Sequence, residues 1–157
     1  MTVGTQLPFD RLVRAVDDWA AAAGRSDIVA QIGRSTYRPR AIEAHPFLDP
    51  AEFTRLQKQA DLLVAHCGIG SMLAALEAGQ PVLMMPRRHA LGEHRNDHQW
   101  ATAQALRGLA GVHIADDEQQ LVELLERPEQ LVAPAVIADK APEAFTRELK
   151  SLLRTLC

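Results

Sequence analysis

Apolar residues along the chain recur with two different spacings. Between Phe9 and Ala23 they lie three or four positions apart, which is typical of a helix with one buried face. Shorter apolar runs, typical of strands, lie at residues 2–3, 27–32, 42–47, 62–66, 82–86 and 112–115. Further helices are predicted at residues 50–59, 71–78, 97–106 and 118–126 and in the tail after Pro142. This alternation predicts an α/β fold, a doubly wound parallel sheet with helices on both faces, in a single domain over residues 1–157.

Residues that favour helix ends support these bounds. Gly24 follows the first helix and suits the left-handed conformation of a C-cap. Asp49 followed by Pro50 is typical of a helix start. Ser71 is also a good N-cap residue. We therefore expect the helix after the glycine turn to begin at Ser71.

Three unusual segments, residues 4–8, 66–71 and 87–99, each follow a predicted strand. The carboxyl ends of parallel strands share one edge of a sheet, where ligands bind in such folds. In the middle segment, Gly68 and Gly70 let the backbone turn sharply and approach a ligand closely. A helix that starts there would direct unpaired N–H groups at an anion. A plain strand-to-helix connection is the alternative interpretation.

Composition narrows the class of protein. The 157 residues are 47% apolar and 24% charged with a formal net charge of −3, which does not favour binding to nucleic acid. No stretch approaches the roughly 20 apolar residues that span a bilayer, and the N-terminus does not resemble a signal peptide. The two cysteines, Cys67 and Cys157, are expected to be reduced, which fits a cytoplasmic protein.

Three ordered motifs resemble a known family. VGTQLPFDRLVRAV, HCGIGSMLAALEAGQPVLMMPRR and GEHRNDHQ are similar to the C-terminal, donor-binding half of family-28 glycosyltransferases. The resemblance covers about Val3 to Leu106. It is nearest to the stand-alone catalytic subunits of two-part enzymes that extend lipid-linked sugars, such as bacterial exopolysaccharide subunits and the subunit of the dolichol-linked N-acetylglucosamine transferase. It implies a Rossmann-like domain, the C-terminal half of a GT-B fold.

The resemblance also implies a donor site. The family's first glycine loop corresponds to residues 4–6, its His-Ala-Gly-x-Gly-Ser motif to 66–71, its Glu-Ala-Gly-x-Pro motif to 77–81, and its Asp/Asn-His-Gln motif to 97–99. The glycine loops would hold the diphosphate of a UDP-sugar, and Gln99 would bind hydroxyl groups of the sugar. The implied donor-binding residues are Gly4, Thr5, Gln6, His66, Gly68, Ile69, Gly70, Ser71, Glu77, His98 and Gln99.

Two positions depart from the family pattern. Members usually have a glutamate three residues after the serine of the second glycine motif, where it holds the ribose hydroxyls. This chain has Ala74 there, and Glu77 follows one helical turn later. Members also usually have several more apolar residues before Val3, so the first strand is short and an upstream start of the chain is expected.

The function implied by the resemblance is that of a glycosyltransferase subunit. It would transfer a hexose or an N-acetylhexosamine from a UDP-sugar to a polyprenyl-diphosphate-linked saccharide, without a further cofactor. A membrane-anchored partner subunit would hold it at the inner face of the membrane, in the cytoplasm. The alternatives are a non-catalytic nucleotide-sugar-binding or scaffold module, which Ala74 favours, and an unrelated flavodoxin-like fold.

Catalytic residues are open at this stage. His66, Glu93 and Asp97 are candidates, but a buried histidine, a solvated loop charge and a helix N-cap are their respective structural alternatives. A base could also come from the partner. Arg34, Arg87 and Arg88 could add positive charge near the diphosphate.

Two further groups of side chains in this region are ambiguous. Without an Asp-x-Asp motif we predict no metal, although His89, His94 and His98 could be interpreted as ligands. A basic loop at residues 34–40 could meet a partner or an acidic lipid, or could simply be solvated.

Overall fold

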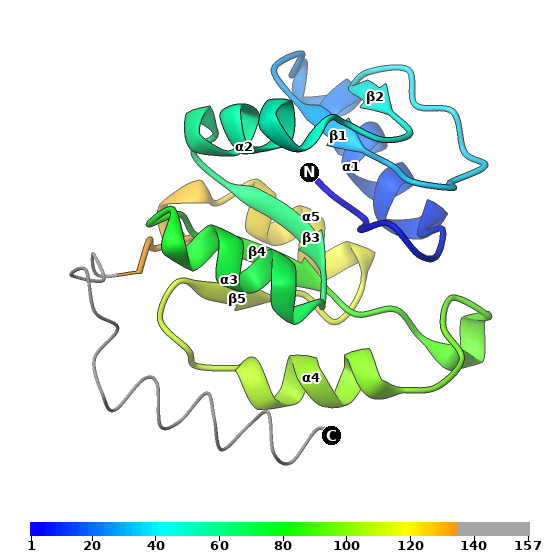
Figure 1. Ribbon diagram of the computed structural model, residues 1–157, viewed down its shortest axis with the longest axis vertical. Helices are drawn as coiled ribbons and strands as arrows, with labels where there is room; N and C mark the ends of the chain where they lie inside the picture. Colours follow the sequence, from blue (N-terminus) through cyan, green and yellow to red (C-terminus); the bar gives the residue numbers. More distant parts are fainter. Residues whose placement is uncertain (135–157) are drawn as a thin grey trace.

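The computed structural model describes residues 1–134, in which parallel strands lie between helices (Figure 1). The strands are β1 (Val29–Gln31), β2 (Glu43–His45), β3 (Leu63–His66), β4 (Val82–Met85) and β5 (Val112–Ile114). The helices are α1 (Asp10–Ala23), α2 (Pro50–Gln59), α3 (Ile69–Glu77), α4 (His98–Leu106) and α5 (Glu118–Leu125), with short 3-10 turns η1 (His89–Leu91) and η2 (Pro128–Gln130). The helix predicted after Pro142 lies outside the described residues.

The strands pair in parallel throughout. β1 pairs with β2, and β3, β4 and β5 form a second set in that order. Thr2 connects the two sets because it bridges Gln31 of β1 on one side and Ala65 of β3 on the other. The resulting order is β2, β1, the N-terminal residues, β3, β4 and β5. The chain start therefore occupies a central place in the sheet.

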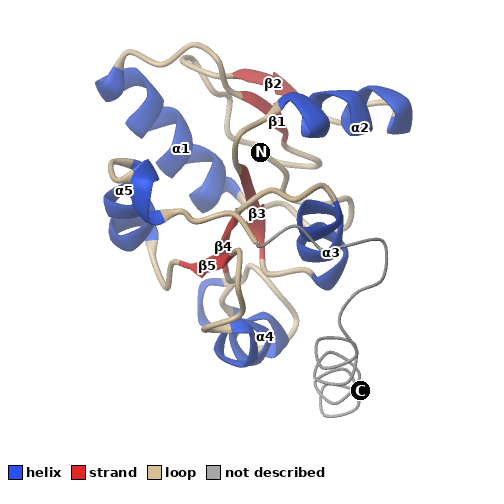
Figure 2. Cartoon of the chain, turned by 90° about the vertical axis from the view of Figure 1, so that its left-hand side faces the viewer, coloured by secondary structure: helices blue, strands red, loops and turns tan. Residues whose placement is uncertain are grey.

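Helices cover both faces of this sheet. Val64 and Leu83 pack in one hydrophobic cluster with residues of α1 and α5, whereas their neighbours Ala65 and Met84 pack in a second cluster with residues of α3 and α4. Figure 2 shows α1 and α5 on one side of the strands and α3 on the other. Since successive strand residues point to opposite faces, all four residues of β4 are buried. The predicted doubly wound α/β fold is confirmed.

Local signals explain where several helices begin and end. Gly24 ends α1 at φ 65°, and its N–H bonds back to the carbonyls of Ala20 and Ala21. Asp49 caps α2, with its carboxylate accepting the Ala51 N–H at 2.9 Å.

The predicted start of α3 is wrong by two residues. The N-cap of α3 is Gly68, in an extended conformation, and its carbonyl accepts the N–H of Met72 at 3.2 Å. Ser71 therefore lies inside the first turn, and no side chain caps the helix. Gly68 replaces Ser71 at this position because glycine is also accepted at an N-cap.

One helix is attached differently from the others. α2 contains no buried residue, although Phe53 and Leu56 face a cavity between it and the sheet. The side-chain amide of Gln80 donates to the carbonyls of Gln57 and Ala60 at the end of α2. No helix within residues 1–134 is long and apolar enough to cross a membrane.

Candidate functional site

Two glycine-containing segments meet around the side chain of His66. The segment of residues 4–8, here called the first glycine loop as a whole, follows the N-terminal bridge. The glycine turn (residues 66–71) follows β3. A Cβ atom on Gly4, which has φ +78°, would lie 2.7 Å from Cε1 of His66, and a Cβ on Gly68 would collide with Nε2. Only glycine at both positions leaves room for the imidazole between them.

His66 is held in a mostly buried place that disfavours its charged form. Its Nδ1 atom is buried and has no hydrogen-bond partner among residues 1–134. Burial, with a smaller contribution from the charge of Arg87, lowers the pKa of His66 to about 4. The ring is therefore neutral at neutral pH.

The N-terminus of α3 adjoins this histidine and presents backbone donors. The N–H groups of Ile69, Gly70 and Ser71 belong to the first helical turn and have no acceptor within the described part of the chain. Gly70 is exposed, and a Cβ there would meet no atom within 4 Å. Such a turn attracts anions because its N–H groups and the helix dipole point the same way.

The third segment at this edge contains the Asp-His-Gln motif. Asp97 and His98 are exposed at the start of α4, whereas Gln99 is 9% exposed. Its Oε1 atom accepts the N–H of Arg87 at 3.1 Å. Gln99 therefore fixes the backbone after β4. The sequence predicted that Gln99 binds sugar hydroxyls, but it did not predict this backbone contact.

Arg87 and Arg88 were expected to add positive charge near a diphosphate. Both side chains instead bind groups of the protein itself. The Arg87 side chain donates to the backbone carbonyls of the first glycine loop and its neighbour, and burial lowers its pKa to about 10. Arg88 donates to the Asp116 carbonyl at 2.7 Å and lies over the Trp100 ring at 5.0 Å. The third, Arg34, is exposed and makes no side-chain hydrogen bond or ion pair within residues 1–134.

The two carboxylates proposed as bases differ in their surroundings. Glu93 pairs with Arg11 at 2.7 Å and has a side-chain exposure of only 12%. The alternative prediction of a solvated loop charge at Glu93 is therefore wrong. Asp97 occupies the N-cap position of α4 but makes no cap bond there. Its carboxylate instead accepts the N–H of His89 at 3.2 Å.

Some predicted site residues lie away from His66. Glu77 is the last residue of α3 and exposed, so roughly 12 Å of helix separates it from the first residue of α3. Ala74 is half-buried one turn beyond Ser71. Thr5 and Gln6 are exposed on the first glycine loop.

The histidines of the third segment use their rings locally. Nδ1 of His89 lies 3.0 Å from the His94 carbonyl, and Nδ1 of His94 lies 3.0 Å from Oδ1 of Asn96. Among residues 1–134, no group of three or more histidine, cysteine, aspartate or glutamate side chains is arranged to hold a metal ion.

Sequence reasoning missed two polar residues of α1. Arg11 binds Glu93 and Glu118 from distant parts of the chain, and no local pattern singles it out. Asp17 is 3% exposed and accepts hydrogen bonds from the segment that leads into β2. Its position next to Val16 and four residues after Val13, on the apolar face of the helix, was the signal.

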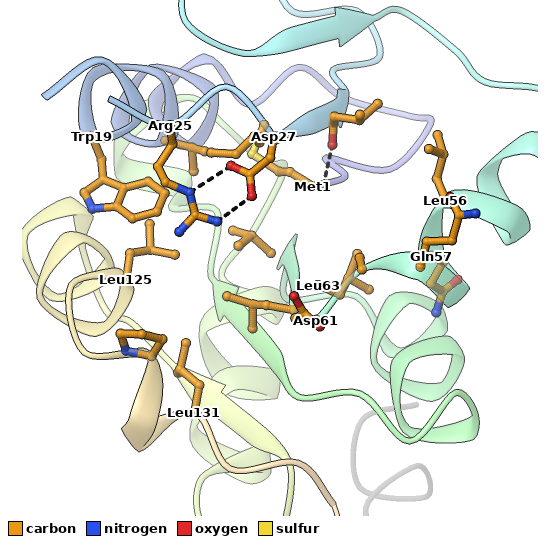
Figure 3. Close-up of a pocket in the computed structure, with 18 of the residues that line it drawn as sticks. Met1, Trp19, Arg25, Asp27, Leu56, Gln57, Asp61, Leu63, Leu125 and Leu131 are labelled. Carbon is orange, nitrogen blue, oxygen red and sulfur yellow. Dashed lines mark hydrogen bonds and ion pairs between the residues drawn. The ribbon is translucent and has the colours of Figure 1, made fainter. Parts of the chain in front are cut away.

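A cavity of about 540 Å³ lies at the opposite edge of the sheet (Figure 3). Its walls include Met1, Leu63, Leu125 and Leu131, and the ion pair between Arg25 and Asp27 lies at its margin. The cavity lies at the amino ends of the strands, because Leu63 begins β3 and Asp27 precedes β1. Leu125, at the end of α5, and Leu131, after η2, close it from the helical side. The cavity lacks the glycine turn and helix start that make an anion site, so it is separate from the candidate site.

Comparison with known proteins identifies the family. The model of the glycosyltransferase family 28 C-terminal domain matches residues 1–153, and the chain therefore belongs to this family. It is 34% identical over 116 residues to the UDP-N-acetylglucosamine transferase subunit ALG13 of Mus musculus, a match that covers 68% of this chain and 10% of the mouse protein.

A bacterial relative matches a longer part of the chain. The UDP-N-acetylglucosamine–N-acetylmuramyl-(pentapeptide) pyrophosphoryl-undecaprenol N-acetylglucosamine transferase of Hydrogenovibrio crunogenus is 27% identical over 150 residues, which are 85% of this chain and 41% of that enzyme. The chain thus spans less than half the length of these two relatives.

Solved structures share the fold. The solution structure of ALG13 superposes with a TM-score of 0.65 at 16% identity, covering 97% of this chain and 94% of that one. The glycotransferase of kitacinnamycin superposes with a TM-score of 0.55 at 22% identity, covering 99% and 38% respectively. The fold is that of one domain of GT-B glycosyltransferases, the C-terminal domain in family 28.

Proposed function

We propose that the chain binds a UDP-sugar at the carboxyl edge of the sheet, with the diphosphate against the N-terminus of α3. The observation that carries this proposal is the meeting of the two glycine segments at His66, beside the N–H groups of Ile69, Gly70 and Ser71. Each exposed contact between an anion and a helix terminus contributes about 0.3–1 kcal/mol. Family membership makes a sugar nucleotide the expected anion.

The same proposal extends to the reaction. We propose a glycosyltransferase subunit that transfers a hexose or N-acetylhexosamine to a polyprenyl-diphosphate-linked saccharide, as in exopolysaccharide synthesis. Support comes from the relatives' names, since ALG13 is a UDP-N-acetylglucosamine transferase subunit and the bacterial enzyme acts on a pyrophosphoryl-undecaprenol acceptor. A separate membrane-anchored partner would complete the acceptor site and hold this chain at the cytoplasmic face of the membrane.

Transfer requires a stabilised leaving diphosphate and a deprotonated acceptor hydroxyl. The helix terminus serves the first requirement in this proposal, and neither a metal nor a cofactor is part of it. For the second, Asp97 is the candidate base that is both exposed and without an ion pair within residues 1–134. The partner is the other possible source of a base.

Calorimetry with Gly70→Ala tests the diphosphate site. Wild type is expected to bind UDP more tightly than UMP, because the second phosphate adds contacts to α3. The Gly70→Ala methyl group fills open space in front of the helix start, so UDP binding should fall about tenfold or more. Folding provides the control, since alanine stabilises an exposed helix by about 0.5–1 kcal/mol over glycine and the melting temperature should not fall.

The second candidate function is a non-catalytic nucleotide-sugar-binding module. Ala74, in place of the family's glutamate, favours it. A transfer assay separates this candidate from the enzyme. Coexpression with a membrane-anchored partner should yield a complex that transfers sugar to a lipid-linked acceptor. UDP binding without transfer by that complex would favour the module. No UDP binding at millimolar concentration, with or without the partner, would refute both.

A further inference from the structure

An arginine from the end of β4 holds the first glycine loop. Arg87 is 3% exposed, and its guanidinium donates to the carbonyls of Val3 at 2.7 Å, Leu7 at 2.7 Å and Pro8 at 3.3 Å. A planar guanidinium with five N–H donors suits several carbonyls at once, which a lysine ammonium does not. The path of the first glycine loop is therefore set by a side chain from the segment that follows β4.

A second arginine connects the same two parts of the chain from the other side. Arg11 lies on α1, just after the first glycine loop. Its side chain reaches the loop between β4 and α4 (residues 86–97, called the third loop below). Its guanidinium binds both carboxylate oxygens of Glu93, at 2.7 and 2.9 Å, and the carbonyl of Pro86 at 3.0 Å. It also binds Glu118 of α5 at 2.9 Å. The two loops are thus connected in both directions, by Arg87 of the third loop and by Arg11 of the helix that follows the first glycine loop.

The two guanidinium groups share one aromatic ring. Phe9 is 1% exposed, and the guanidinium carbons of Arg87 and Arg11 lie 4.9 and 5.3 Å from its ring centroid. Cations at such distances are attracted to an aromatic ring. The ring therefore fixes the arginines relative to each other as well as to α1.

Glu93 closes the third loop on itself. Besides binding Arg11, its carboxylate accepts the N–H of Arg88 at 2.9 Å. The preceding backbone is fixed at the same time, because the Arg87 N–H donates to Gln99. The carboxylate of Glu93 is thus committed to a guanidinium and a backbone amide, and neither oxygen is left free to face an acceptor hydroxyl.

We propose that Arg11, Arg87 and Glu93 are positioning residues that lock the first glycine loop and the third loop into one unit, and that Glu93 is not the general base. The inference deepens the proposed function, on which it rests for the statement that these loops bind the donor. The lock itself is a property of the fold and can be measured without any ligand.

Amide hydrogen exchange of the full chain tests the lock, with Glu93→Gln and Glu118→Gln as a matched pair. Both changes remove one charged partner of Arg11, but only Glu93 lies on the third loop. Glu93→Gln and Arg11→Lys should speed exchange in residues 88–93 by about tenfold or more, whereas Glu118→Gln should change it less than about twofold. Equal effects of the two glutamine variants, or unchanged exchange in Arg11→Lys, would overturn the proposal.

Binding and kinetics complete the test. Glu93→Gln should weaken UDP binding and raise KM for the donor about fivefold or more, with a smaller effect on kcat. Loss of kcat with unchanged loop exchange and donor KM would instead make Glu93 a catalytic group and overturn the inference. If the wild-type chain binds no UDP, the proposed function fails, while the exchange experiment still decides whether the lock exists.

Discussion

At the scale of single residues, the site depends on how little space surrounds one imidazole ring. Gly4 and Gly68 approach His66 from two separate segments, so that neither position accommodates a side chain without moving the ring. The same closeness removes the ring from water and keeps it neutral at neutral pH. The close packing of the two glycines thus determines both the room available to the His66 ring and its protonation state.

Gly4→Ala should lower the free energy of unfolding by about 2–3 kcal/mol in urea denaturation. A positive φ costs an alanine about 1 kcal/mol, and the new Cβ would also displace the His66 ring. Gly24→Ala is the matched control, since Gly24 has φ +65° but no atom within 4 Å of its Cβ. It should cost only about 1 kcal/mol, and equal losses for both variants would contradict the crowding at His66.

A second prediction at this scale concerns the missing glutamate. Ala74 is half-buried and lies three residues after Ser71, on the same face of α3. Ala74→Glu should tighten UDP binding about tenfold in calorimetry, because a carboxylate there would accept hydrogen bonds from the ribose. Ala78→Glu, which adds the same charge at the exposed end of α3, should leave the affinity unchanged. Similar effects of both variants would show that position 74 does not face the ribose.

At the scale of elements, α1 organises more of the molecule than its amphipathic pattern indicates. Its buried face packs against the sheet, but its polar residues also determine where other segments lie. Asp17 accepts the N–H groups of Arg40, Ala41 and Ile42 at 2.8–3.2 Å, just before β2 begins. One buried carboxylate therefore fixes the entry into the edge strand.

Asp17→Asn should lower the free energy of unfolding at pH 7 by about 2 kcal/mol, because an amide replaces a charged acceptor of several hydrogen bonds. Burial alone would raise the pKa of Asp17, but the hydrogen bonds from Ala41, Tyr37 and their neighbours bring it below the usual 3.8. A depressed folded-state pKa stabilises the fold above about pH 4, and this contribution is lost as the pH falls through that lower pKa.

Urea denaturation of wild type and Asp17→Asn at several pH values measures this effect. The difference in stability should be largest at neutral pH and should shrink in acid, where the wild-type carboxyl is also protonated. Asp18→Asn is the control, because Asp18 is an exposed neighbour on the same helix, and should stay within about 0.5 kcal/mol of wild type. A difference that grows in acid would contradict the assigned role.

At the scale of the whole molecule, the arrangement of layers was predictable and the long-range polar contacts were not. Helix ends such as Gly24 and Asp49 are set by neighbouring residues, and the shared edge of the two glycine segments follows from a parallel sheet. Arg11 and Glu93, in contrast, are 82 residues apart in the chain. Nothing local in the sequence distinguishes Arg11 and Glu93 from charged residues that remain exposed, so the sequence suggested a base where the structure has an ion pair.

The start of α3 illustrates an intermediate case. Both Gly68 and Ser71 are acceptable N-cap residues, and the usual preference for serine favours the later start. The close approach of Gly68 to His66 decides in favour of the earlier start. The consequence matters for the site, because it moves the first helical N–H groups next to the histidine.

The weak attachment of α2 has a consequence for how the molecule opens. A helix without a buried residue gives up little apolar contact when it detaches, so its local unfolding costs much less free energy than unfolding of the sheet. Phe53 and Leu56 would leave with it and expose the cavity beneath. The amino edge of the strands is therefore the less stable side of the fold, while the edge that carries the glycine segments is held by the guanidinium groups of Arg87 and Arg11.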